Sequence, residues 1–431
     1  MSEYYRLIRH QGNQSLFQVV EMSVTSLVNE QAFHIQAEGL RGTGKTTIMR
    51  AARALLPPIT RIKNCVYNCD PAKPHCPLHR QLSLAEIAAL GTEQVPRPFL
   101  EISQAAKPGT VVGSIDLAKL TDTHNPLAAL LPGTIPQAHR GIIFIDEINR
   151  LVDTAPELAD VLLDVMGTRP GRVQIEEAGL PVVELPVTVC VWAAANPDED
   201  PGALCTIRKQ LADRFDVTVA MGRPVSEQAV IHILAGDTGS RPVVGSSNGI
   251  SLDLDTVSIG EEVRRLLAKL YIIYKLESLR TVIAMETAAR LNALQAGRNV
   301  AGLIDLVQVA PWTLKHRVGE DILAAIMAYL AGLLSNQPAV MLPASESIVV
   351  VNQKKATYWS LLWSSIKNKL ASLRHSQSRL PGCGRSSQAN GGGAQFIDPL
   401  HTKIIAPPKS AMPLSRLPDE QLVTRDSQPH G

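Results

Sequence analysis

Short segments with many apolar residues recur through the first half of the chain, at positions 33–37, 98–102, 142–146, 187–194 and 216–220. Residues 142–145 form a continuous apolar run. A strand that is covered on both faces gives such a run, because neither face meets water, and this is typical of parallel sheets flanked by helices. The pattern therefore predicts an α/β core over residues 30–235, preceded by an N-terminal extension at 1–29.

The second half has a helical period instead. Apolar residues recur at helical spacing over 261–276, 281–295, 301–316 and 319–334. Such segments predict amphipathic helices that pack on one another, so we expect an all-α lid domain over 261–335. Glycine, serine and proline are frequent between core and lid, and residues 236–260 are expected to be a linker.

The tail, residues 336–431, contains one amphipathic pattern, at 354–374. Its apolar residues share one helical face and its lysines lie elsewhere. This helix would pack on the lid, dock a partner or lie on a membrane surface, and the sequence leaves these three readings open. The rest of the tail is rich in polar residues, glycine and proline, and we expect it to be disordered.

A phosphate-binding loop follows the first predicted strand. Gly39, Gly44, Lys45 and Thr46 fit the Walker A pattern G-x-x-x-x-G-K-[ST], before a predicted helix at 45–56. In this pattern backbone N–H groups surround phosphate oxygens, the lysine reaches the outer phosphates and the hydroxyl binds Mg²⁺. The neighbouring Arg41, Gly42, Thr43 and Thr47 would complete a binding site for ATP.

Polar residues end two later strands. Asp146 and Glu147 follow "GIIFI", and Asn196 follows "VTVCVWAAA". Ligands of parallel sheets bind beyond the carboxyl ends of the strands. Asp146 is therefore expected to hold Mg²⁺, and Glu147 to polarise the attacking water. Asparagine is also a common turn residue, so Asn196 by itself is a weaker indication.

Overall charge and apolar segments narrow the class of protein. Lysine and arginine number 42 and aspartate and glutamate 40, a net charge of +2, which does not favour a nucleic-acid partner. The first residues lack the apolar stretch of a signal peptide, and the longest apolar segment, 322–334, is too short to cross a bilayer. We expect a cytoplasmic protein.

Three of the six cysteines are close together in the sequence. Cys65, Cys69 and Cys76 are followed by His79, with His75 as a spare imidazole. Three thiolates and one imidazole are an accepted ligand set for structural Zn²⁺. The three-residue spacing between the first two cysteines departs from the common knuckle. An iron–sulfur cluster and reduced, unliganded thiols therefore stay open as alternatives.

Together the motifs resemble the AAA+ ATPase subunit of magnesium chelatase and, more distantly, MoxR-type ATPases. The resemblance runs from about Phe33 to Arg317 and rests on the following segments: the phosphate loop, "GTIPQAHRGIIFIDEINRL", "DVLLDVMGTRPGRVQIEEAG", "AAANPDED", "LADRFDV", "SLRTVIAMETAARL" and "TLKHR". It implies an AAA+ P-loop core with a helical lid, in a ring that is usually hexameric, with ATP at each subunit boundary.

The resemblance also assigns roles. Asn196 matches the sensor that orients the attacking water, Arg214 the arginine finger given to the neighbour's ATP, and Arg280 the lid sensor of the γ-phosphate. Arg208 is an alternative finger. Residues 111–141 match the family's insertion and 172–186 its hairpin, which would transmit motion to a partner.

The implied partners are an integrin-like adaptor subunit and a catalytic chelatase subunit. The adaptor carries a metal site of the form D-x-S-x-S, which this sequence lacks, so the chain would be only the motor. The alternative is a MoxR-like chaperone that remodels a client protein during metal-cofactor assembly. The complete set of ATPase residues argues against a third reading, a nucleotide-binding regulator with little turnover.

Overall fold

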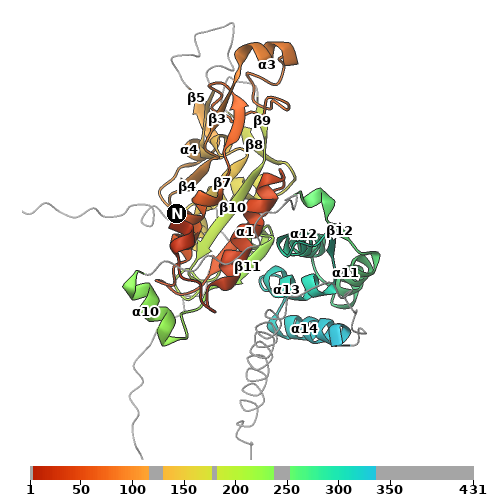
Figure 1. Ribbon diagram of the computed structural model, residues 1–431. Coiled ribbons are helices and arrows are strands. Elements are labelled where there is room, and N and C mark those ends of the chain that lie inside the picture. Colours follow the sequence, from red (N-terminus) through yellow and green to blue (C-terminus); the bar gives the residue numbers. More distant parts are fainter. Residues whose placement is uncertain (1–2, 116–129, 177–181, 237–252, 336–431) are drawn as a thin grey trace, which may run out of the picture. The chain divides into compact units, whose positions relative to one another are not determined.

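The computed structural model describes residues 3–115, 130–176, 182–236 and 253–335, and Figure 1 shows how its elements are arranged. All of these residues belong to one compact unit, residues 1–341. A five-stranded, all-parallel sheet lies in it, in the order β11-β1-β10-β7-β4. The strands are β1 (Ile35–Glu38), β4 (Phe99–Ile102), β7 (Gly141–Ile145), β10 (Val189–Ala195) and β11 (Val217–Ala220).

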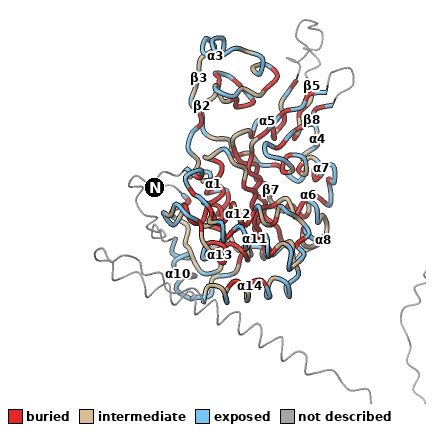
Figure 2. Tube along the Cα trace, turned by 90° about the vertical axis from the view of Figure 1, so that its right-hand side faces the viewer, coloured by how far each residue is buried: buried red, intermediate tan, exposed pale blue. Residues whose placement is uncertain are grey.

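The apolar runs form this sheet because they are buried on both faces. Every residue of β7 and of β10 is buried, and Figure 2 shows β7 in the buried interior. All five predicted strands are present, with ends shifted by at most two residues. The expected α/β fold with a parallel sheet is confirmed.

Helices and short 3-10 turns surround the sheet. They are η1 (Glu3–Arg6), α1 (Gln14–Val28), α2 (Lys45–Ala51), η2 (Ala52–Leu55), α3 (Leu84–Leu90), α4 (Pro108–Val112), α5 (Thr134–Gln137), α6 (Ile148–Thr154), α7 (Pro156–Val165), α8 (Leu204–Ile207), α9 (Lys209–Ala212) and α10 (Glu227–Ala235). The predicted helix at 45–56 is therefore an α-helix that finishes as a 3-10 turn.

Helix α1 lies within the predicted N-terminal extension, residues 1–29. It packs on β1, β11 and the lid helix α12, and its residue Phe17 is fully buried. Its Ser23 hydroxyl donates to the Phe33 carbonyl at 2.7 Å and accepts from the Trp192 indole at 2.8 Å. The segment is thus part of the packed core.

The lid consists of α11 (Glu261–Ile273), α12 (Leu279–Gln295), α13 (Leu303–Leu314) and α14 (Glu320–Ser335). These match the four predicted helices. The turn η4 (Leu254–Thr256) precedes them, and a two-stranded parallel sheet joins β12 (Ser258–Ile259) to β13 (Val300–Ala301). Within the lid the buried Asp305 carboxylate accepts from Arg298 and Asn292.

Three antiparallel pairs complete the described part of the chain. They are β2 (Ile59–Ile62) with β3 (Thr92–Val95), β5 (Gly113–Ile115) with β6 (Leu130–Pro132), and β8 (Gly171–Ile175) with β9 (Val183–Val187). The last pair is the hairpin predicted at 172–186. The middle of the expected insertion, most of the linker and the predicted helix at 354–374 lie outside the described residues.

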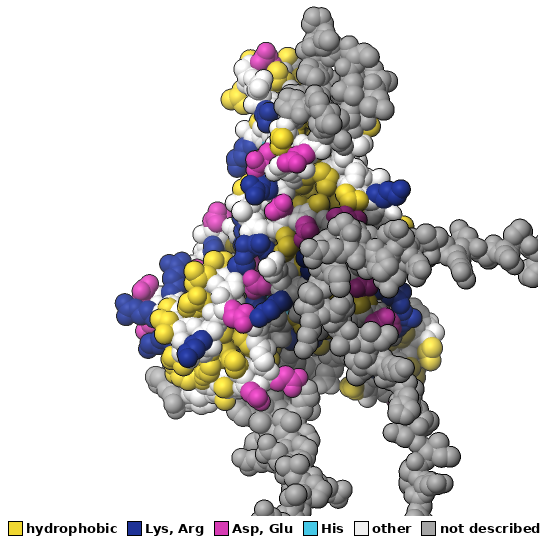
Figure 3. Space-filling view, turned by 180° about the vertical axis from the view of Figure 1, so that it is seen from behind, with side chains coloured by type: hydrophobic (Ala, Val, Ile, Leu, Met, Phe, Trp, Pro, Cys, Tyr) yellow, Lys and Arg dark blue, Asp and Glu magenta, His cyan; other side chains and the backbone are white. Residues whose placement is uncertain are grey.

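The surface agrees with the near-neutral composition. On the face drawn in Figure 3, basic and acidic side chains of the described residues are interspersed. Among the described residues, no helix combines the length and the apolar character that a bilayer crossing requires.

Candidate functional site

The phosphate loop lies at the carboxyl end of β1. Gly44 has φ 89° and immediately precedes α2, a backbone conformation that side chains with a Cβ rarely adopt. Gly39 is also constrained, because a Cβ there would lie 2.6 Å from the Met221 carbonyl oxygen. Glycine is therefore required at both positions to shape the loop.

Lys45 is buried and points back into the loop. Its ammonium group donates to the carbonyl oxygens of Gly39 (2.6 Å) and Leu40 (2.8 Å) and to the side-chain oxygen of Asn196 (2.8 Å). Burial lowers the pKa of Lys45, and the nearby carboxylates, Asp146 first among them, oppose that shift. Two residues 151 positions apart thus meet at the carboxyl edge of the sheet.

Thr46 faces the acidic strand end. Its hydroxyl lies 3.1 Å from each oxygen of the Asp146 carboxylate. Arg50, one turn further along α2, lies 3.9 Å from Asp146 and makes two hydrogen bonds to Glu101, at 3.0 and 2.9 Å. A hydroxyl and a carboxylate at this separation are the hard oxygen donors that Mg²⁺ prefers.

Glu147 is held in an uncommon conformation. Its φ is 52° and its ψ 50°, in the left-handed region that few residues other than glycine occupy. The side chain accepts from Gln104 at 2.8 Å and lies 3.3 Å from the Arg150 guanidinium. Such backbone strain is frequent at functional sites, because the surrounding structure must enforce it.

The remaining loop residues have separate contacts. Arg41 forms an ion pair with Glu199 at 2.5 Å, and the Thr43 hydroxyl donates to the Leu40 carbonyl at 2.9 Å. Gly42 has φ 71° and, like Thr47, is exposed. Sequence reasoning had not singled out Glu199, whose position three residues after a strand tip is a weak signal.

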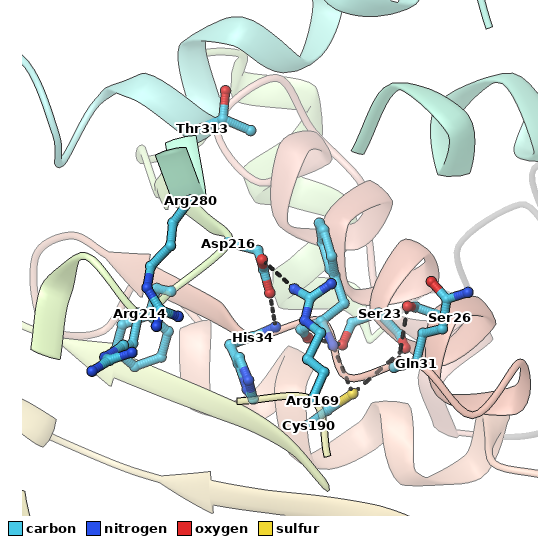
Figure 4. A network of polar contacts seen from close by, with 12 residues as sticks. Ser23, Ser26, Gln31, His34, Arg169, Cys190, Arg214, Asp216, Arg280 and Thr313 are labelled. Atoms are coloured by element: carbon cyan, nitrogen blue, oxygen red, sulfur yellow. Dashed lines mark hydrogen bonds and ion pairs between the residues drawn. The ribbon is translucent and has the colours of Figure 1, made fainter. Parts of the chain in front are cut away.

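Arg214 and Arg280 lie at the other edge of the sheet. Both donate to the Gly167 carbonyl oxygen, Arg214 at 3.3 Å and Arg280 at 2.7 Å, and Figure 4 shows them side by side. They line a cavity of about 420 Å³ together with His34, which immediately precedes β1. Burial lowers the pKa of Arg280, and the neighbouring Arg214 lowers it further.

Asp216 organises this arginine cavity. Its carboxylate accepts from the backbone N–H of His34 at 2.8 Å and from Arg169 at 2.7 Å (Figure 4). Arg317, between the lid helices α13 and α14, donates to Asp213 at 3.0 Å and to the Phe215 carbonyl at 2.6 Å. Sequence reasoning did not single out Arg169 or Asp216, although both lie within segments that carry the resemblance.

The other predicted residues lie elsewhere. Arg208, the alternative finger, donates to the Pro156 carbonyl at 3.1 Å and lies 3.3 Å from Asp160. It is not among the residues that line the arginine cavity. The ligand atoms of Cys65, Cys69, Cys76 and His79 all lie within 4.8 Å of one another.

Comparison with known proteins places this geometry in a family. A family model described as the AAA lid domain matches residues 264–327, in the helical lid. The magnesium-chelatase 38 kDa subunit of Acidiphilium rubrum is 33% identical over 305 residues, which cover 67% of this chain and 84% of that relative. The chain belongs to the magnesium-chelatase 38 kDa subunit family. It is therefore an AAA+ ATPase, and the resemblance inferred from the motifs is confirmed.

Two other relatives of this ATPase are also magnesium-chelatase subunits. The magnesium-chelatase 38 kDa subunit of Chlorobaculum parvum is 27% identical over 324 residues, 71% of this chain and 89% of that protein. The magnesium-chelatase 67 kDa subunit of Heliobacterium mobile is 33% identical over 202 residues, 46% of this chain and 28% of that protein. The AAA+ family implies ATP and Mg²⁺ as cofactors.

His34 makes the stability of this ATPase depend on pH. Burial lowers its pKa from 6.5 to about 4, and its Nδ1 accepts from the Val191 N–H at 3.1 Å. The unfolded chain binds a proton near pH 6.5, so this contribution to stability is complete above that pH and falls as the pH drops towards 4. The free energy of unfolding lost through His34 should reach about 3 kcal/mol.

His34→Asn tests this pH dependence. It keeps an acceptor and should flatten the pH dependence of chemical unfolding between pH 6.5 and about 4. The same change at the exposed His232 should not, and equal profiles for both variants would contradict the assignment.

Proposed function

We propose that this ATPase is the motor subunit of a magnesium-chelatase-like complex, in which a separate subunit inserts the metal into a tetrapyrrole. The proposal rests on the separation of two groups of ATPase residues within one chain, which we call the two half-sites of the nucleotide site. Lys45 lies at the carboxyl edge of the parallel sheet, whereas Arg214 and Arg280 lie at its amino edge. Both half-sites can serve one nucleotide only if neighbouring chains supply them, which favours a ring.

The carboxyl-edge residues fit the nucleotide that the family implies. Bound MgATP would supply the phosphoanhydride to be cleaved, with its charge partly neutralised by Mg²⁺. Lys45 already donates to the loop carbonyl oxygens and to the side-chain oxygen of Asn196, so its ammonium can exchange these acceptors for phosphate oxygens. Thr46 and Asp146, 3.1 Å apart, would hold the metal ion.

Glu147 and Asn196 have complementary tasks in this proposal. Glu147 would accept the proton of the attacking water, and its fixed backbone and its contact with Gln104 limit where the carboxylate can lie. Asn196 would orient that water while its oxygen remains near Lys45. Positioning and charge stabilisation of this kind account for most of the catalysis of phosphoryl transfer.

Arg214 and Arg280 would then act on the neighbour's ATP. Both already share one carbonyl acceptor beside a cavity of about 420 Å³, and guanidinium groups are suited to phosphate oxygens. We propose a ring of six subunits, as the resemblance implies, with Arg214 as the finger and Arg280 as the lid sensor in trans. The insertion around β5 and β6 and the β8–β9 hairpin would transmit motion to an adaptor and a catalytic subunit.

Reconstitution tests the proposed complex. The purified ATPase, combined with the porphyrin-binding and adaptor subunits of its source organism, should produce ATP-dependent Mg²⁺ insertion, followed by the fluorescence of the metallated tetrapyrrole. ATP hydrolysis without insertion, but with ATP-dependent remodelling of a lone integrin-domain protein, would instead support the MoxR-like chaperone.

Two substitutions separate binding from hydrolysis. Lys45→Ala should abolish nucleotide binding, because phosphate charge is no longer neutralised. Glu147→Gln should bind ATP but hydrolyse it at least about 100-fold more slowly, because the general base is lost. Fluorescent-nucleotide titration and single-turnover hydrolysis measure the two effects. Normal turnover by Glu147→Gln would remove Glu147 from the proposed mechanism.

Mixed rings test action in trans. Arg214→Ala and Glu147→Gln proteins should each be nearly inactive alone. In a 1:1 mixture about a quarter of the boundaries would unite a wild-type Glu147 with a wild-type Arg214, so hydrolysis should return to about that fraction. Mixing Glu147→Gln subunits with Arg214→Ala, Glu147→Gln double-variant subunits at the same ratio controls for assembly, because no boundary then has a wild-type Glu147. Constant activity per subunit on dilution to monomers would contradict the ring.

A further inference from the structure

A compact cluster of sulfur atoms lies in the segment between β2 and α3. Cys65, Cys69 and Cys76 are buried, with exposed fractions of 3%, 0% and 0%. Their sulfur atoms and a ring nitrogen of His79 all lie within 4.8 Å of one another. The three cysteines form no disulfide with one another, so the tight packing brings together four groups that could bind a metal ion.

The hydrogen bonds around Cys69 favour a thiolate. Its sulfur accepts from the backbone N–H groups of His75 (3.4 Å) and Cys76 (3.3 Å). His75 Nδ1 also lies near the same sulfur, at 3.3 Å. Several N–H donors aimed at one sulfur stabilise negative charge on it, which a neutral thiol does not need. They are typical of the shell around metal-bound cysteine.

We propose that Cys65, Cys69, Cys76 and His79 bind one structural Zn²⁺ ion. A set of buried thiolates is costly without a positive charge among them, and three sulfurs with one imidazole match the tetrahedral Cys₃His composition of closed zinc sites. With four protein ligands no position stays open for substrate, so the ion has a structural task. The site is separate from the ATPase residues and does not depend on the function proposed above.

His75 is a positioning residue and not a ligand. Its contact in the cluster is with Cys69, whereas His79 Nδ1 lies 3.2 Å from Cys76 Sγ and belongs to the converging group. The His75 ring instead packs on the His139 ring, with centroids 3.8 Å apart. This contact orients His75 so that it can donate to the Cys69 sulfur.

The ion would anchor its loop to the start of β7. Asn68 donates to the Gln137 carbonyl at 2.6 Å, and Asp70 pairs with Arg140 at 3.1 Å. Gln137 and Arg140 lie just before β7, the strand that Asp146 follows. The loop also buries Tyr67, and the metal would add to the free energy that keeps it folded against this strand.

Metal analysis of the purified full-length protein tests the site. We expect about one equivalent of zinc per chain and no visible iron–sulfur absorption. Cys69→Ser and His79→Ala should each lower the zinc content to below about half an equivalent, while the exposed Cys205→Ser serves as the matched cysteine control and keeps it. His75→Ala should retain zinc but bind it about 10- to 100-fold more weakly in a chelator competition.

Substitution of the wild-type protein with Co²⁺ gives a readout that does not require the variants to fold. Tetrahedral cobalt with three thiolates should show intense visible ligand-field bands and sulfur-to-cobalt charge transfer in the near ultraviolet. Zinc and iron together below about a tenth of an equivalent, with no such cobalt spectrum, would overturn the proposal. So would an iron–sulfur spectrum, or full zinc content in both ligand variants. None of these outcomes depends on ATP hydrolysis.

Discussion

The parallel register of three strands is the constraint from which the nucleotide half-site follows. Glu38 of β1 pairs with Ala195 of β10, and Ala193 of β10 pairs with Ile145 of β7. The three strands therefore end nearly level, and the next residues along the chain, Gly39, Asn196 and Asp146, meet at one edge. A slip of one residue would turn a fully buried strand over and separate these groups. Every residue of β7 and β10 is buried, because both faces of these strands are covered.

Much of this arrangement could be predicted from the sequence. Short segments with many apolar residues indicated the five strands, since burial on both faces leaves a local signal in the sequence. The Walker A pattern and the acidic strand end were recognisable for the same reason: their spacing is fixed by the local chain. The four lid helices were also predicted, because each repeats its apolar residues at helical spacing over several turns.

The features that could not be predicted from the sequence depend on contacts between residues that lie far apart in the chain. The packing of helix α1 could not be predicted, because its partners, the sheet and α12, lie far away in the sequence. The shared acceptor of Arg214 and Arg280 is a backbone carbonyl at Gly167, which no side-chain pattern reveals. The left-handed Glu147 is likewise enforced by its surroundings. In the cysteine segment the residue types could be read from the sequence, but only folding brings their ligand atoms within 4.8 Å of one another.

The paired arginines have a consequence for how subunits hold together. In a single chain two guanidinium groups share one carbonyl oxygen, and burial first and their mutual repulsion second lower the pKa of Arg280. Such a pair of guanidinium groups is suited to binding an anion. In the proposed ring, the negative charge of the neighbour's nucleotide would relieve this repulsion and attract the two subunits to each other. Loss of the γ-phosphate would weaken this electrostatic attraction at that subunit boundary. A chemical step would thereby change the mechanical stiffness of the ring.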